Sequence, residues 1–487
     1  MMREWIITPA VVVLMAMVGC GDDGGDVSVD TQADTGDDTS VGDTSTSDDT
    51  SVGDTSTPDD TSTPDDTSTP DDTSTPDDTS TPDDTTADTV SPLQDYSSFP
   101  GVMLLDNETR LHAITLLEGG DLVIVGEEAS PQHSIVRQFD GSGDTVKMAS
   151  FPFGRANKVH QLANGNVMVA IQEKGATQSD HSVSVHELIT NAAGNGSLPR
   201  LMRYSLSQVE GYPDFVYNAP GSLFEYPNGD IGITAVGVPK GANTAPITYT
   251  LRMTPAGAIT SNVFLGLGTG VRSHGAISSA GHLVGCVTNV DPLPDDEDAI
   301  GGLDVGLLKV KESDSSVVTG LVGSTEDDFC YGLVADDADG VVIVGRTDGI
   351  FTGDAQDGVD GFIARYDADF NELWAVQTVG QDQNNPRGVT IGDDGHIYVA
   401  GLTLFDGVGS KAWVASYTAS GVERWTKTFG VGIGLTIAWD AVQYGDDLFV
   451  IGEFRKKDAD TAFEGETATS DIAGFVLRLD AATGVIR

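Results

Sequence analysis

The stretch GLVADDADGVVIVGRTDGIFTGDAQDGVDGFIARYDADFNELW, residues 332–374, contains one complete structural unit. Within it, Val341–Val344 is an unbroken apolar run, which is typical of a strand buried on both faces. Asp339 and Gly340 precede this run, and Asp-Gly pairs tolerate the positive φ angles of a tight hairpin turn. The unit therefore predicts four short antiparallel strands, at Gly332–Ala335, Val341–Val344, Phe362–Tyr366 and from Leu373 onward.

The chain repeats this unit seven times. A turn glycine precedes an apolar run at Gly120, Gly165, Gly229, Gly281, Gly340, Gly395 and Gly445, and successive repeats are 45 to 64 residues apart. Matching third strands are expected at Ile135–Phe139, Leu201–Tyr204, Tyr249–Met253, Gly306–Val310, Phe362–Tyr366, Trp413–Tyr417 and Phe475–Leu479. Four strands at such a period are typical of a propeller. The predicted fold is all-β, a seven-bladed β-propeller of four-stranded antiparallel blades.

A propeller must close its ring, and the seventh copy has only Gly484–Arg487 left for an outer strand. Val102–Leu105 stands alone before the first repeat, at the spacing of a fourth strand. We expect it to complete the last blade and so join the two ends of the folded part. The alternative is an extra edge strand.

Residues 1–19 are typical of an export signal, with Arg3 at the start and an apolar run over Ile6–Val18. The run is too short for a spanning helix. Small residues before Cys20 resemble the bacterial lipoprotein signal, which implies cleavage before Cys20 and acylation of that residue. An ordinary cleaved signal is the alternative. Gly21, by the same resemblance, implies lipid anchoring at the outer membrane of a bacterial cell envelope.

Residues 20–91 are of low complexity, with 22 Asp and no Lys, Arg or Glu, and the hexamer Thr-Ser-Thr-Pro-Asp-Asp occurs five times in succession up to Asp84. Such a segment cannot form an apolar core, and its like charges repel one another. We expect a disordered acidic stalk that holds the folded domain away from the membrane. Its Ser, Thr and Pro content also permits O-glycosylation.

Residues 92–487 form the predicted propeller, with 52 acidic and 24 basic residues. The whole chain has a formal net charge of −50. A surface of this charge disfavours nucleic acids and anionic lipids. We expect a monomer whose contact with the membrane is made through the lipid anchor.

Parts of the chain are similar to the bacterial β-propeller repeat family. The similarity covers Val344–Gly349, Asp360–Asp367 and Leu373-Trp374, and again Ile397–Thr403 with Trp413–Tyr417. It extends over roughly residues 320–480 and leaves only the rhythm of strands and turns before them. The resemblance implies an extracytoplasmic seven-bladed ring and no particular activity.

Four arginines lie where the inner strands are expected to begin: Arg110, Arg155, Arg272 and Arg387, with His274 close in register. Cations gathered at one mouth of the ring would suit an anionic ligand, such as an acidic sugar or a peptide carboxylate, because arginine binds carboxylates through two parallel hydrogen bonds. The alternative is that each arginine forms a local ion pair with one of the many carboxylates.

No metal site is predicted, and calcium binding at two acidic segments is the alternative. Asp367, Asp369 and Asn371 mimic the start of a calcium loop, but Glu372 replaces the expected glycine, which favours a plain turn. The acidic insertion Asp291–Asp304 is a second candidate for calcium. No cofactor is expected otherwise.

Cys286 and Cys330 fall on neighbouring blades, and export permits a disulfide between them. Buried free thiols are the alternative.

The sequence contains no Gly-x-Ser-x-Gly elbow and no recognisable catalytic arrangement of Ser, His and Asp. We therefore interpret the protein as a lipid-anchored binding or scaffold module, displayed at the cell surface or in the periplasm. The alternative function is an extracytoplasmic enzyme that acts on polysaccharide, with an Arg/His site at the mouth of the ring.

Overall fold

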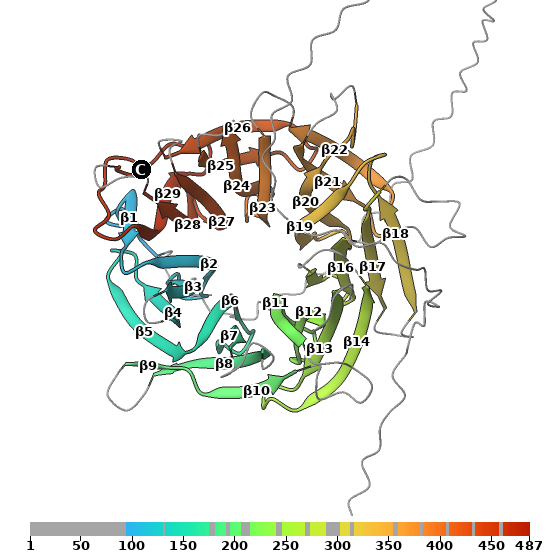
Figure 1. Ribbon diagram of the computed structural model, residues 1–487, viewed down its shortest axis with the longest axis horizontal. Coiled ribbons are helices and arrows are strands. Elements are labelled where there is room, and N and C mark those ends of the chain that lie inside the picture. The colour runs from blue at the N-terminus through green and yellow to red at the C-terminus, as the bar shows by residue number, and fades with distance from the viewer. Residues whose placement is uncertain are drawn as a thin grey trace, which may run out of the picture. The chain divides into compact units, whose positions relative to one another are not determined.

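The computed structural model describes residues 94–487, except for the segments 130–131, 175–180, 191–194, 206–214, 240–245, 268–272, 289–301, 312–315, 354–358, 379–382, 406–408, 431–433 and 457–460. The predicted signal, Cys20 and the stalk lie outside the described residues. All regular elements described are β-strands, arranged in seven sheets around a central axis (Figure 1). The prediction of a seven-bladed propeller is therefore confirmed.

Each sheet has an innermost strand beside the axis and three further strands in order outward. The innermost strands are β2 (Thr109–Leu116), β6 (Gly154–Gln161), β11 (Phe215–Glu225), β15 (Ser273–Ile277), β19 (Asp328–Ala335), β23 (Gln383–Ile391) and β27 (Leu435–Tyr444). The second strands are β3 (Leu122–Ala129), β7 (Val167–Glu173), β12 (Ile231–Pro239), β16 (Leu283–Thr288), β20 (Val341–Thr347), β24 (Ile397–Phe405) and β28 (Asp447–Arg455).

The third strands are β4 (Gln132–Phe139), β8 (Ser182–Thr190), β13 (Ile247–Met253), β17 (Val305–Val310), β21 (Asp360–Tyr366), β25 (Gly409–Tyr417) and β29 (Ile472–Asp480). The outer strands are β5 (Thr145–Pro152), β10 (Arg200–Tyr204), β14 (Ile259–Leu267), β18 (Val317–Val322), β22 (Glu372–Thr378), β26 (Glu423–Phe429) and β1 (Val102–Leu105). A short strand, β9 (Gly196–Ser197), pairs with the end of β8.

The prediction for the second blade needs one correction. Leu201–Tyr204, expected as a third strand, belongs to the outer strand β10, which pairs with β8. The third strand is instead Ser182–Thr190, whose apolar residues alternate with polar ones. The interval between Gly165 and Gly229 is the longest, at 64 residues, and the rhythm of apolar runs alone does not show which of its segments is the third strand.

The ring closes as predicted. β1 pairs antiparallel with β29, from Val102 opposite Leu477 to Leu105 opposite Gly474, so the first described strand completes the last blade. Figure 1 shows β1 beside β29 at the place where the two ends of the colour scale meet. Arg478 N also donates a hydrogen bond to Gly101 O at 2.9 Å, one residue before β1.

Two aromatic residues that precede β1 pack beneath this closure. The ring centroid of Tyr96 lies 4.7 Å from that of Phe449. The ring of Phe99 meets Phe449 edge to face, with 5.2 Å between centroids. Phe99 also contacts Phe139 of the first blade, with 6.4 Å between ring centroids. The N-terminal segment thus joins the last blade to the first.

The apolar core is divided among the junctions between blades. In the described part of the chain there are seven clusters of buried residues, and each draws its side chains from two neighbouring sheets. One cluster, for example, joins Val342 and Ile363 of one blade to Val399 and Trp413 of the next. Because both faces of each sheet are apolar, every blade needs a neighbour on either side to exclude water from its faces.

Cys286 on β16 and Cys330 on β19 are joined by a disulfide. The two strands belong to neighbouring blades, and both cysteines lie within the apolar cluster at that junction. Of the two alternatives left open by the sequence, the structure has the cross-link.

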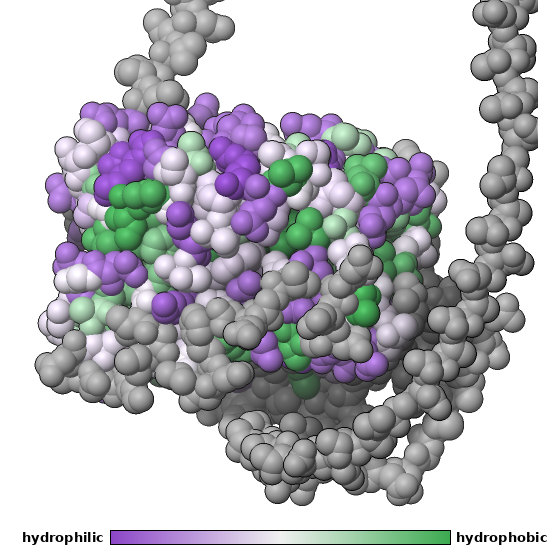
Figure 2. All heavy atoms as spheres, turned by 90° about the horizontal axis from the view of Figure 1, so that it is seen from above, coloured by the Kyte–Doolittle hydropathy of each residue, from purple (hydrophilic) through white to green (hydrophobic). Residues whose placement is uncertain are grey.

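The outer surface mixes polar and apolar side chains. On the side of the ring shown in Figure 2, hydrophobic residues form small separate patches among hydrophilic ones. Phe153 is the most exposed of the large apolar side chains described, at 69% of its surface. In the described part of the chain, no helix has the length and apolar character needed to cross a membrane.

Candidate functional site

Six of the seven innermost strands shift register at the same level, by one residue that has no partner on the second strand. These unpaired residues are His112, Asn157, Gly221, Tyr331, Arg387 and Trp439. A β-bulge of this kind redirects a side chain and is common next to binding sites. The bulge residues occupy equivalent positions on their strands, and together we call them the bulge column.

Four consecutive members of the bulge column contact one another. The guanidinium carbon of Arg387 lies 4.2 Å from the ring centroid of Tyr331 and 5.9 Å from that of Trp439. The Trp439 ring in turn meets His112 edge to face, with 6.3 Å between centroids. Tyr331, Arg387, Trp439 and His112 come from four successive blades, and all four are partly exposed. We call this set the aromatic–arginine stack.

The rest of the bulge column is smaller. Asn157 follows His112 around the ring, and the Oδ1 atom of Asn157 is buried with no hydrogen-bond partner among the described residues. Gly221 comes next and has no side chain. The large side chains of the bulge column therefore come from four successive blades.

Charged groups lie directly beside the stack. Asp440 follows Trp439, and its carboxylate accepts hydrogen bonds from Ile114 N at 3.2 Å and Ala441 N at 2.9 Å. Burial raises the pKa of Asp440, and the charge of Lys158 partly opposes this rise. Lys158 follows Asn157 on a blade that is separated from the Asp440 blade by the β2 sheet. The charge of Lys158 thus reaches Asp440 across one intervening blade.

Arg387 supplies the positive charge of the stack, because His112 is neutral. Burial, together with the nearby charge of Arg155, lowers the pKa of His112 to about 3. Its imidazole is therefore unprotonated at neutral pH, and it contributes an aromatic edge to the stack. The Nε2 atom of His112 is buried and has no hydrogen-bond partner among the described residues.

Arg110 and Arg155 have a different environment, in which both are held by buried carboxylates. Glu127 of β3 contacts Arg110 Nη1 at 3.1 Å and Arg155 Nη2 at 2.6 Å. Glu453 of β28 lies 3.3 Å from Arg110 Nε. Burial alone would raise the pKa of Glu127, but the hydrogen bond and the charge of Arg155 lower it to about 2. This network joins three consecutive blades by ion pairs.

The other two predicted ligand-binding residues, Arg272 and His274, are not placed in the stack. Arg272 lies outside the described residues. His274 is buried on β15, opposite Cys286 in register. Of the five predicted ligand-binding residues, the structure thus places Arg387 in the stack, and Arg110 and Arg155 in the ion-pair network that adjoins His112.

Tyr331 and Trp439 were not identified from the sequence. The sequence does contain a pattern that could have identified them. Tyr331 is followed by Gly and Trp439 by Asp, at the strand position where Arg387 is followed by Gly388. Aligning the innermost strands on the apolar run that follows would have placed both in one column with Arg387.

The calcium candidates are accounted for in part. The Asp367 carboxylate accepts hydrogen bonds from the backbone N of Asp369 and of Asn371, each at 2.9 Å, so this segment is a turn as the sequence favoured. Asp304 is buried at the start of β17, whereas residues 289–301 of the acidic insertion lie outside the described residues. Where the structure is described, no three His, Cys, Asp or Glu residues are grouped so as to hold a metal ion.

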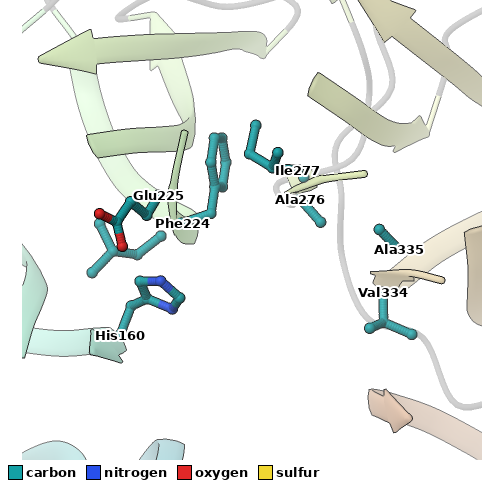
Figure 3. Close-up of a pocket in the computed structure, with 9 residues that line it drawn as sticks. His160, Phe224, Glu225, Ala276, Ile277, Val334 and Ala335 are labelled. Carbon is teal, nitrogen blue, oxygen red and sulfur yellow. The ribbon is translucent and has the colours of Figure 1, made fainter. Parts of the chain in front are cut away.

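A cavity of about 310 Å³ opens near the other ends of the innermost strands (Figure 3). Its lining comes from β6, β11, β15 and β19, so it spans four blades. On β6, His160 lies three residues beyond Asn157, which separates the cavity from the bulge column by about 10 Å along the axis.

One wall of the cavity is polar. His160 and Glu225 lie together on one side in Figure 3, and Val334 and Ala335 lie on the opposite side. Glu225 Oε2 accepts a hydrogen bond from Ala163 N at 2.6 Å, which fixes the orientation of the carboxylate. Burial lowers the pKa of His160, and the charge of Glu225 partly opposes this effect.

Comparison with known proteins adds a likeness of fold. The scan against protein families finds no match, and the search of curated proteins finds none. Among solved structures, the β-propeller domain of the Trilobed protease from Pyrococcus furiosus is similar at 10% identity and a TM-score of 0.44, over 77% of this chain and 96% of that one.

Puromycin hydrolase is similar at 12% identity and a TM-score of 0.47, over 78% of this chain and 53% of that one. The α-L-arabinofuranosidase Arb93A from Fusarium graminearum is similar at 11% identity and a TM-score of 0.40, over 66% of this chain and 91% of that one. At such identities the likeness concerns the propeller architecture alone, which hosts many unrelated functions.

Proposed function

We propose that this protein is an exported binding module, tethered to the bacterial cell envelope through a lipid on Cys20, that holds an anionic glycan on the axis of its propeller. The observation that carries the proposal is the position of Arg387 between the rings of Tyr331 and Trp439. A guanidinium stacked on aromatic rings is oriented before the ligand arrives, so less freedom is lost on binding.

The chemistry beside the stack suits a sugar acid. Arg387 can donate two parallel hydrogen bonds to a carboxylate, and the faces of Tyr331 and Trp439 can pack against the apolar face of a sugar ring. Asp440, held by two backbone amides, is available as an acceptor for a sugar hydroxyl.

The contacts of Arg110 and Arg155 argue against a catalytic role for Glu127. The enzyme alternative requires a carboxylate that converges with the arginines and remains available to a substrate. Glu127, which does converge with them, is held by both Arg110 and Arg155. A carboxylate in two ion pairs, with its pKa lowered to about 2, is poorly suited to accept or donate protons at neutral pH.

Titration calorimetry with trigalacturonic acid tests this proposal. We expect binding that weakens about tenfold or more in Arg387→Gln, because a charge-assisted hydrogen-bond pair is lost. Arg252→Gln is the matched control, since Arg252 also stacks on a ring, that of Tyr226 at 4.1 Å, pairs with Asp230 at 2.8 Å and does not belong to the stack. This variant should bind within about twofold of the wild type.

Galactotriose, which has the same size but no carboxylate, should bind far more weakly than trigalacturonic acid. Equal affinities for the two sugars, or equal effects of the two arginine variants, would contradict the assignment of Arg387. Release of new reducing ends during the titration would favour the enzyme alternative instead.

The lipid anchor has its own test, which is metabolic labelling with a fatty-acid probe in the native host or a Gram-negative bacterium. The wild-type chain should incorporate the probe, and Cys20→Ala should not. Label that persists in Cys20→Ala would rule out acylation at this residue.

A further inference from the structure

We propose that the cavity beside His160 and Glu225 is a second binding site, separate from the aromatic–arginine stack, which takes a small apolar molecule that carries a protonated amine. The proposal does not depend on the function of the stack. It rests on the size of the cavity, on its apolar walls and on the charge of its lining.

The size of the cavity, about 310 Å³, is at the lower end of the range found for small-molecule sites. Most of the surrounding side chains are apolar, and they include Leu223, Ile277 and Val334. A compact apolar group of a ligand, such as one aromatic ring, would therefore bind favourably by displacing water from these side chains.

The charge of the lining selects a cation. Among the described residues that line the cavity, Glu225 is the one that carries a charge at neutral pH, since burial keeps His160 in its neutral form. A carboxylate offers about four lone-pair positions, and the hydrogen bond from Ala163 N uses one of them. Glu225 can therefore also accept a hydrogen bond from an ammonium group.

His160 strengthens the preference for an amine. The neutral imidazole of His160 can accept a hydrogen bond from the same ammonium group. The strongly negative chain, at −50, also raises the local concentration of small cations.

Benzylamine is the probe for this site, and phenylacetate is the matched compound of opposite charge. Ligand-observed NMR and calorimetry on the purified protein should show binding of benzylamine and none of phenylacetate at the same concentration. Glu225→Gln keeps the acceptor for Ala163 N but removes the charge, and it should weaken benzylamine binding about tenfold or more.

Glu118→Gln is the matched control, because Glu118 is an exposed carboxylate on a turn at the same end of the innermost strands and does not line the cavity. It removes the same charge and should change the affinity less than twofold. Equal losses in Glu118→Gln and Glu225→Gln would show that the acidic surface attracts the amine without a site, and would overturn the proposal.

A second variant fills the cavity and leaves the charge in place. Ala276→Leu should abolish benzylamine binding, and its melting curve should still show one cooperative transition, which establishes that the variant is folded. Benzylamine binding that survives this substitution would also overturn the proposal. Arg387→Gln should bind benzylamine normally, which separates this site from the stack.

Discussion

Substitution of Phe99 by alanine should lower the stability of the whole propeller, because Phe99 belongs to the segment that joins the last blade to the first. Its side chain is 3% exposed and contacts Phe449 of the last blade and Phe139 of the first. Replacing a buried phenylalanine by alanine typically costs about 3–5 kcal/mol, from lost burial and from the cavity left behind.

The expected shift of the melting temperature follows from the size of the folded part. At about 2.1 cal/mol/K per residue, a folded part of about 390 residues has an unfolding entropy of about 0.8 kcal/mol/K. A loss of 3–5 kcal/mol then lowers the melting temperature by about 4–6 °C. Differential scanning calorimetry of wild type and variant at one scan rate measures this shift.

Phe153→Ala is the matched control, because Phe153 is 69% exposed and the same atoms are removed. We expect its melting temperature to change by less than about 1 °C. A double-mutant cycle between Phe99→Ala and Phe449→Leu should give a coupling of about 1 kcal/mol for the ring pair. If Phe99→Ala melts like Phe153→Ala, the N-terminal segment does not stabilise the closed ring and our account of the closure is wrong.

Three further predictions concern contacts between blades. Replacing Cys286 and Cys330 together by serine should lower the free energy of unfolding by about 4 kcal/mol, since the disulfide spans 44 residues, and the wild type should show the same loss when melted with a reductant. The pKa of Glu127 is lowered from 4.5 to about 2, so its ion pairs stabilise the fold fully above about pH 4.5, and this contribution is lost as the pH falls through 2. The melting temperature should therefore fall more steeply between pH 4.5 and 2 for the wild type than for Glu127→Gln. An equal fall in the two proteins would contradict the ion-pair network. Lys309→Met should destabilise the protein by about 3 kcal/mol, because Lys309 Nζ is buried, lies 3.0 Å from Asp339 Oδ2 and donates to Ala368 O at 2.6 Å. Lys311→Met, one residue beyond the end of β17, should leave the melting temperature nearly unchanged.

Most of the architecture could be predicted from the sequence, because each blade carries its own local signals. The turn before each apolar run needs a positive φ angle, and Gly165, Gly229 and Gly395 have it, at 87°, 85° and 73°. In the quoted repeat the same role falls to Asp339, with a φ of 64°. The closure by Val102–Leu105 could be predicted as well, since the four-stranded repeat leaves one extra strand before the first blade and lacks an outer strand in the last.

The candidate site was harder to predict, because it depends on register and on packing between blades. Tyr331 and Trp439 each resemble ordinary core residues of a strand, and a one-residue bulge redirects them toward Arg387. Glu127 is distant in sequence from Arg155, and the two meet because neighbouring sheets pack side by side. The disulfide depends on the same packing, and the cysteines carry no local signal that separates a cross-link from two buried thiols.

The central functional claim is that an anionic ligand binds on the aromatic–arginine stack, and the indole N–H signal of Trp439 tests it most directly. The wild-type protein should show a shift of this NMR signal on addition of trigalacturonic acid, with the signals of Trp374, Trp413 and Trp425 unchanged, and Arg387→Gln should show no shift at the same concentration. A shift confined to the other tryptophans, or one that persists in Arg387→Gln, would place the ligand elsewhere and contradict the account.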